Sequence, residues 1–264
     1  MSFLQGFILS VIQGIAEFLP ISSSGHLLVV RNFMNLEDAP VIFDILLHFA
    51  TLVVIVVVFR KRIWSLIKVL FELKNLKTDN DVKQRFNVVL FILLSTFITA
   101  VMGVFIDGLE ISNPKIVYSL FIFTGSFLFV GKYLKGSVDF TKMGIKNSVL
   151  IGISQGIGVL PGVSRSGITI TTGVFSGLSR EAASEYSFII SIPAIVGAVV
   201  LKIGEAEALL DVVSLPVVIF SLIVTMFVGY FSLKLLLKLL NSGKFHYFSF
   251  YLIPLGILGL IWGK

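Results

Sequence analysis

Six stretches of about 20 mostly apolar residues determine what this chain of 264 residues can fold into. They cover residues 42–59, 86–106, 115–134, 186–203, 214–233 and 246–262. A helix of this length crosses a hydrocarbon layer of about 30 Å. The chain is 56% hydrophobic and only 14% charged, and its mean hydropathy is +1.00, unlike a soluble domain. We therefore predict an all-α integral membrane protein with six transmembrane helices.

Two further apolar regions, at about 3–33 and 148–178, are interrupted by clusters of Pro, Ser and Gly. The first cluster runs from Leu19 to His26, and the second runs from Leu160 to Gly167. Irregular backbone survives at membrane depth only where protein or a water-filled cavity satisfies its polar groups. Each region is therefore predicted to be a re-entrant helical hairpin, in which two half-helices are joined by a break.

The two interrupted regions match each other at a constant offset of 142 residues. The identical pairs are Gln13 and Gln155, Gly14 and Gly156, Ile15 and Ile157, Ser22 and Ser164, Ser24 and Ser166, and Gly25 and Gly167. Each half then holds one hairpin and three spans, and an odd number of spans turns the second half upside down. The prediction is a single membrane domain over residues 1–264, built as an inverted-topology repeat with halves at about 1–140 and 141–264.

The net charge of +6 comes from Lys and Arg residues in short loops beside the apolar stretches. Such basicity indicates topology rather than a nucleic-acid partner. The loop at 60–85 is rich in bases, whereas the loop at 204–213 carries Glu205, Glu207 and Asp211 and no base. By the positive-inside rule the first loop is cytoplasmic and the second is external. Both termini and the opening of the first hairpin then face outward, and the second hairpin opens toward the cytoplasm.

Ionisable and hydroxyl side chains gather at the two breaks. Glu17 and His26 flank the first break, and Arg165 lies between two serines in the second. Ionisable groups inside a membrane are costly and usually functional. Glycine backbone and the start of a half-helix can bind an oxyanion, and the planar guanidinium of Arg suits phosphate. The pattern favours one phosphate site shared by both hairpins.

Two simpler interpretations of these residues remain open. Glu17 and Arg165 could form a buried ion pair that only holds the hairpins together. The serines could be ordinary helix caps. The ionisable residues elsewhere in the apolar regions, for which no role is assigned, are Asp44, His48 and Glu185.

The sequence resembles the undecaprenyl-pyrophosphate phosphatase family of the bacitracin-resistance type over essentially the whole chain. One family motif is Glu or Gln, Glu four residues later, Phe-Leu-Pro and Ser-Ser-x-Gly-His, here from Gln13 to His26. The other is Pro-Gly-x-Ser-Arg-Ser-Gly, here from Pro161 to Gly167. The resemblance implies hydrolysis of a polyprenyl diphosphate lipid to the monophosphate and inorganic phosphate, which recycles the lipid carrier for cell-envelope synthesis. It also implies a multi-pass protein of the plasma membrane with an active site on the external side.

The resemblance implies that Ser23 is the nucleophile, His26 a general base or acid beside it, and Arg165 the stabiliser of phosphate charge. Glu17 would be a metal or proton partner. These roles make physical sense, because a hydroxyl needs a nearby base to attack and phosphoryl transfer depends on positioning and charge neutralisation. The residues expected to bind substrate are Gln13, Ser22, Ser24, Gly25, Ser164, Ser166, Gly167 and Thr169.

A divalent cation, Mg²⁺ or Ca²⁺, is expected at Glu17 and Gln13. The two side chains are four residues apart and so share a helix face. Many members of the family carry a carboxylate at the position of Gln13, so this chain has one negative charge fewer to hold a cation.

The main alternative function is a polyprenyl-phosphate flippase, because inverted repeats with broken helices are a common plan of transporters. A purely structural membrane protein is a third hypothesis. The enzyme differs from both in having a nucleophile with its base. The small residues Ala194, Gly197 and Ala198 could pack helices within one subunit or between two, so a homodimer is one option.

Overall fold

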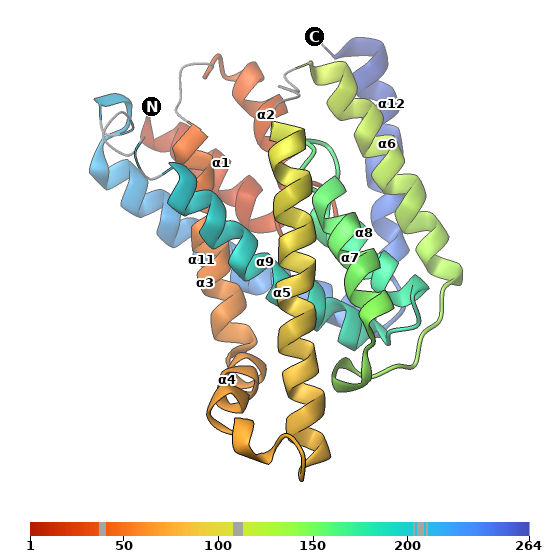
Figure 1. Cartoon of the computed structure of the whole chain (residues 1–264). Helices are drawn as coiled ribbons and strands as arrows, with labels where there is room; N and C mark the ends of the chain where they lie inside the picture. Colours follow the sequence, from red (N-terminus) through yellow and green to blue (C-terminus); the bar gives the residue numbers. More distant parts are fainter. Residues whose placement is uncertain (37–40, 108–112, 203, 205–208, 210, 264) are drawn as a thin grey trace.

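The computed structural model describes residues 1–36, 41–107, 113–202, 204, 209 and 211–263, which form helices joined by short turns (Figure 1). Five of these helices are long and apolar enough to cross a membrane. They are α5 (Asn80–Asp107), α6 (Pro114–Val130), α9 (Arg180–Lys202), α11 (Leu215–Asn241) and α12 (Ser249–Trp262) with the short helix before it. The prediction of an all-helical chain is confirmed for the described residues, and the apolar helices fit a multi-pass membrane protein.

A sixth candidate span is bent. It consists of α3 (Val41–Val58) followed by α4 (Arg60–Lys68), with an angle of 76° between the two parts. We predicted a span at 42–59 and a loop from residue 60. α3 lies where the span was predicted, but the chain turns at Phe59 and continues as α4 and two short 3₁₀ helices, Val69–Phe71 and Leu73–Asn75.

The two interrupted apolar regions each form a pair of short helices. The first pair is α1 (Phe3–Ala16) and α2 (Ser23–Phe33), and the second is α7 (Ile145–Ile157) and α8 (Arg165–Phe175). A helix of 14 residues is about 21 Å long, so none of the four could cross a membrane alone. The helices break at the predicted clusters, while the re-entrant placement of the hairpins in a membrane stays a prediction.

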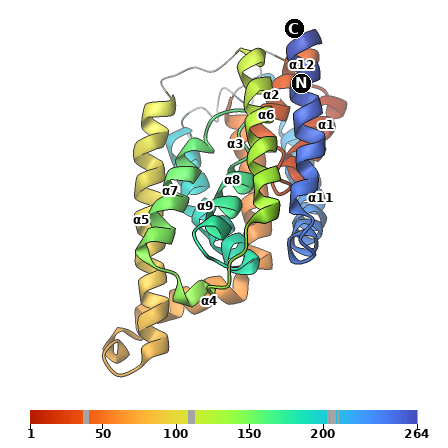
Figure 2. The ribbon, with the colours of Figure 1, turned by 90° about the vertical axis from the view of Figure 1, so that its right-hand side faces the viewer.

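Helices of one half of the chain pack against helices of the other half. In the first half α1 packs against α11, and in the second half α7 packs against α5. Figure 2 shows α6 and α12 side by side, and α3 also packs against α9. Both termini lie at one end of the molecule and α4 lies at the other (Figure 1). Two related halves would produce such reciprocal packing, but the inverted repeat with halves near 1–140 and 141–264 stays a prediction.

Much of the outer surface is apolar. On α5 the side chains of Phe97, Val104 and Phe105 are exposed, the last of them by 76%. Large contiguous apolar surfaces are rare on soluble monomers. Lipid is the environment in which such a surface carries no penalty.

The two hairpins touch at a pair of glycines, which gives a first testable prediction. A Cβ atom on Gly25 would lie 2.9 Å from the Cα atom of Gly162 and 2.6 Å from the ring of Phe121. We expect Gly25→Ala to cost about 1–3 kcal/mol of unfolding free energy through overpacking, measured as thermal unfolding in detergent. The control is Gly103→Ala on α5, where a Cβ atom meets nothing within 4 Å. If both variants unfold at the wild-type temperature, the two hairpins do not lie as close together at Gly25 and Gly162 as the structure places them.

Candidate active site

A serine at the end of each break caps the following half-helix. The Oγ of Ser22 accepts a hydrogen bond from the N–H of Gly25 at 3.4 Å, and the Oγ of Ser164 accepts one from the N–H of Gly167 at 3.1 Å. Ser22 also accepts from the N–H of Gly162 at 3.1 Å, which joins the two hairpins. The helix-cap interpretation therefore holds for these two serines. Ser22 has a φ of 70°, a conformation rare outside glycine that tends to occur at functional sites.

The first residues of α2 and α8 face the same place. Ser23 begins α2 and Arg165 begins α8, and the two positions are equivalent at the offset of 142. The first N–H groups of a helix have no partner inside that helix, and the positive end of the helix dipole attracts anions. Two such helix starts and a guanidinium make the junction suitable for a phosphate group.

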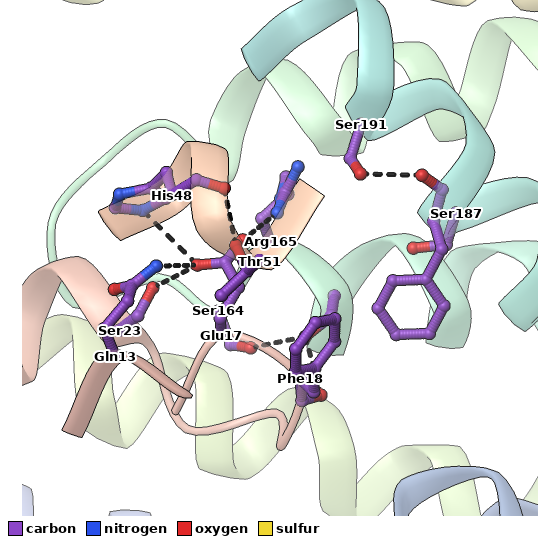
Figure 3. A network of polar contacts seen from close by, with 12 residues as sticks. Gln13, Glu17, Phe18, Ser23, His48, Thr51, Ser164, Arg165, Ser187 and Ser191 are labelled. Carbon is purple, nitrogen blue, oxygen red and sulfur yellow. Dashed lines mark hydrogen bonds and ion pairs between the residues drawn. The ribbon is translucent and has the colours of Figure 1, made fainter. Parts of the chain in front are cut away.

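Glu17 is the centre of the polar contacts at the junction (Figure 3). Its side chain is 3% exposed. One carboxylate oxygen, Oε2, accepts hydrogen bonds from Ser23 Oγ at 2.7 Å and Gln13 Nε2 at 3.1 Å. The same oxygen lies 3.3 Å from Nε2 of His48, and the other oxygen forms an ion pair with Arg165. The hydroxyl of Ser23 thus points at a carboxylate that can accept its proton.

A cavity of about 400 Å³ lies beside these contacts. The predicted site residues that line it are Glu17, Ser22, Ser23, Ser24, Ser164, Arg165 and Ser166. Asp44 from the first turn of α3 and Ala198 from the end of α9 also line it. These parts of α3 and α9 lie toward the end of the molecule that carries both termini (Figure 1). The cavity therefore belongs to the half of the molecule opposite α4.

His26 lies outside the cavity lining. Its Nδ1 is 2.8 Å from the backbone oxygen of Ser22, and its Nε2 is 2.8 Å from the hydroxyl of Tyr251 on α12. Among the described residues no hydrogen bond joins His26 to Ser23. The hydrogen-bond partner of Ser23 is therefore Glu17 and not the expected His26. His26 contacts the backbone of the turn at Ser22 and the hydroxyl of Tyr251.

The remaining predicted residues support the junction without lining the cavity. Gly25 and Gly167 donate their N–H groups to the two caps, and Gln13 reaches the site through Glu17. The hydroxyl of Thr169 contacts the backbone oxygen of Arg165 and the hydroxyl of Ser187. Thr169 therefore holds α8 against α9 instead of facing the cavity.

The ionisable residues that had no assigned role fall into two groups. Asp44 and His48 line the cavity, and Asp44 forms an ion pair with Arg31 of α2. Glu185 forms an ion pair with Arg62 at 2.9 Å, near α4. Tyr251 was missed altogether, since 225 residues separate it from His26 and no motif spacing could have connected them.

Comparison with known proteins gives this arrangement a family. The family model described as "Bacitracin resistance protein BacA" matches residues 6–258. The chain belongs to the BacA family. The resemblance found in the two motifs is therefore confirmed.

Three relatives of this BacA family member carry the same name. A Treponema denticola protein named "Undecaprenyl-diphosphatase" is 45% identical over 267 residues, which cover 100% of this chain and 99% of the relative. A protein of the same name from Borrelia recurrentis is 40% identical over 253 residues, 95% of each chain. A third, from Desulforapulum autotrophicum, is 36% identical over 281 residues, covering 100% of this chain and 99% of the relative.

The donor chemistry at Gln13 and Glu17 is a poor fit to the divalent cation expected there. The Oε1 atom of Gln13 is buried without a hydrogen-bond partner, so one acceptor is available. The carboxylate of Glu17, however, already accepts two hydrogen bonds and pairs with Arg165. Mg²⁺ and Ca²⁺ prefer several oxygen ligands, and the described residues hold no group of three His, Cys, Asp or Glu suited to a metal. The cation stays a prediction.

Proposed function

We propose that this BacA family member is a membrane phosphatase that hydrolyses undecaprenyl diphosphate to the monophosphate and inorganic phosphate. The observation that carries the proposal is the hydrogen bond of Ser23 to Glu17, with Arg165 on the other oxygen of the same carboxylate. A nucleophile, a proton acceptor and a phosphate-binding cation thus meet at one cavity. The shared name of the relatives supports the same activity and substrate.

In the proposed first step, the Oγ atom of Ser23 attacks the terminal phosphorus while Glu17 accepts the hydroxyl proton. The new bond joins Oγ to phosphorus, and the bond from phosphorus to the bridging oxygen breaks. Undecaprenyl phosphate leaves. Arg165 and the N–H groups at the starts of α2 and α8 stabilise the negative charge on the transferred oxygens.

In the second step, water attacks the phosphorus of the phosphoserine. The Oγ atom of Ser23 leaves and takes back the proton from Glu17, while both protons of the water remain on the released phosphate. His48, 3.3 Å from the carboxylate, keeps Glu17 in place between the steps. His26 acts as a positioning residue in this scheme, because it holds the backbone of Ser22 rather than the nucleophile.

The proposed setting is the plasma membrane, with the site open to the external side. The bases at 60–85 surround α4, at the end opposite the cavity, and the positive-inside rule makes that end cytoplasmic. Asp211 lies at the other end, while Glu205 and Glu207 lie outside the described residues. Hydrolysis there would regenerate the lipid carrier used in cell-envelope synthesis.

Two other hypotheses lack support. The relatives are named for a diphosphatase and not for a transporter, so nothing favours the flippase. The homodimer was suggested by small residues on α9, but Ala194 and Ala198 line the cavity. They leave room for a ligand there and provide no argument for a contact between subunits.

The position of Ala198 gives a second prediction. A leucine there would fill part of the cavity, and we expect Ala198→Leu to reduce phosphate release about tenfold or more, because small displacements of a reacting group are costly. The matched control is Gly197→Leu, one residue earlier, where a Cβ atom meets nothing within 4 Å. Equal activity of the two variants would mean that the cavity does not admit the substrate.

The activity itself is tested with purified protein. We expect release of inorganic phosphate from undecaprenyl diphosphate, and a parallel reaction with EDTA decides whether a divalent cation takes part. A properly folded preparation that binds the lipid but releases no phosphate, with or without added Mg²⁺ or Ca²⁺, would overturn the proposed function.

A further inference from the structure

One side of α4 packs against the protein, and the opposite side exposes an aromatic residue where a water-exposed helix would carry polar ones. Leu66 and Val69 are buried against the protein. On the outside Trp64 is 63% exposed, and Phe71, just past α4, is 81% exposed. Figure 2 shows α4 crossing the lower end of the molecule, crosswise to α5. A helix that presents aromatic residues beside bases in this orientation is typical of one lying in the plane of a membrane interface.

A second cavity lies where α3 turns into α4. Its volume is about 320 Å³, and its lining is Val58, Phe59, Arg60, Lys61, Arg62 and Glu185. Arg62 is occupied, because it pairs with Glu185 and stacks over the ring of Phe140 at 4.7 Å. Arg60 and Lys61 are exposed at the cavity, and Arg60 contacts only a backbone oxygen, that of Val57, among the described contacts.

Lys68 at the end of α4 and Arg85 of α5 already have an acidic partner. Glu72 forms ion pairs with Lys68 and with Arg85, each at 3.1 Å. The hydrogen bond from Lys68, with the positive charges of Lys68 and Arg85, lowers the pKa of Glu72 below its usual value, so the carboxylate stays ionised. Within α4, the bases that remain for an external anion are therefore Arg60 and Lys61.

We propose that the cavity at the α3–α4 bend binds the phosphate of an anionic phospholipid, with α4 lying in the membrane interface. Charge complementarity supports this ligand, since basic pockets at the cytoplasmic ends of membrane helices bind anionic head groups. The exposed side chain of Trp64 supports the placement of α4 at the level of the lipid head groups, where tryptophan is enriched. The site lies at the opposite end from the phosphatase cavity and does not depend on the proposed function.

The chain supplies its own probe for this proposal. Its two tryptophans are Trp64 and Trp262, so Trp262→Phe leaves Trp64 as the only one. The protein is placed in vesicles of phosphatidylcholine that contain either brominated phosphatidylglycerol or brominated phosphatidylcholine at equal mole fraction. Bromine quenches tryptophan at short range. We expect phosphatidylglycerol to quench Trp64 several-fold more effectively, and salt to reduce the difference.

The double variant Arg60→Gln/Lys61→Gln, in the same background, should lose this preference while phosphatidylcholine still quenches. The matched control is Lys77→Gln/Lys83→Gln, which removes two exposed bases beyond α4 and should keep it. If the double variant does not fold, Lys61→Gln alone should reduce the preference. Equal quenching of Trp64 by the two lipids in the Trp262→Phe protein would overturn the proposal, as would a preference that survives the double variant. Competition by inorganic phosphate at constant ionic strength would mark a site for free anions instead and would also overturn it.

Discussion

Replacing Ser23 with alanine should lower the release of phosphate from undecaprenyl diphosphate by on the order of 10⁴-fold or more, because no other group then forms the covalent bond. The fold should survive. Glu17 keeps its contacts with Gln13 and Arg165, and the lost hydrogen bond to a charged group costs only about 1.5–3 kcal/mol. Turnover, thermal unfolding and lipid binding are measured on the same preparation.

The matched control for this variant is Ser24→Ala. Ser24 also lines the cavity and is the next residue of α2, but the hydrogen bond to Glu17 comes from Ser23. We expect Ser24→Ala to retain most of the turnover. Equal losses in the two variants would show that the serines only shape the cavity, and high activity in Ser23→Ala would exclude it as nucleophile.

Replacing Arg165 with alanine should lower turnover by about 10³–10⁵-fold, the effect of removing an arginine that stabilises a transferred phosphoryl group. It should also destabilise the protein by about 3–5 kcal/mol, because the buried charge of Glu17 loses its ion pair with Arg165. The loss of activity should be far larger than the loss of folded protein can explain. Turnover per folded molecule, with unfolding followed in parallel, separates the two effects.

A double variant separates this account from the interpretation of Glu17 and Arg165 as an ion pair that only holds the hairpins together. In Glu17→Ala/Arg165→Ala no buried charge is left unpaired, so much of the lost stability should return. Turnover should stay at background, since both the proton acceptor and the phosphate-binding cation are gone. Recovery of activity along with stability would show that the pair is structural only. Arg62→Ala, which breaks the ion pair with Glu185 far from the cavity, should leave turnover nearly unchanged.

The features that could be predicted from the sequence are those that depend on local order along the chain. Apolar stretches of membrane length give helices wherever they occur, and α5, α6, α9, α11 and α12 lie where the stretches predicted them. The clusters around Pro20 and Pro161 end a helix for reasons of backbone chemistry, so both breaks were also predictable. The meeting of the two serine-rich turns followed from their resemblance to each other and to the family.

The partners within the site were harder to predict. His26 is three residues from Ser23 and looked like its base. The backbone between Glu17 and Ser22 is irregular, however, and it turns back on itself. The carboxylate of Glu17 therefore lies within hydrogen-bond distance of Ser23. His48 and Tyr251 arrive from α3 and α12. Such contacts depend on how helices pack, and no local periodicity encodes them.

The segment after residue 60, which carries many bases, was predicted to be a loop between two apolar stretches. Apolar residues alternate with those bases at helical spacing, and they include Trp64, Leu66, Ile67 and Val69. This period describes an amphipathic helix. A search for apolar stretches long enough to span a membrane therefore missed this helix, and the topology that its bases indicate stays a prediction.

The repeat also bears on why the proposed mechanism uses one site and not two. Ser23 and Arg165 occupy equivalent positions, so in the proposed mechanism one copy provides the nucleophile and the other the cation. The position equivalent to Glu17 is Val159, which lines the same cavity. In that mechanism the second hairpin has no proton acceptor at the position equivalent to Glu17, and the two copies would contribute different groups to a single site.

In the proposed mechanism, Ser23 forms a covalent bond to the phosphate that it removes. The direct measurement uses undecaprenyl diphosphate with a radioactive terminal phosphate, mixed with purified protein, quenched in acid within milliseconds and followed by peptide mass spectrometry. We expect labelled phosphate on Ser23 in the wild-type protein and none in Ser23→Ala. Rapid formation of labelled inorganic phosphate with no label on Ser23 at any time, or label on another residue, would contradict it.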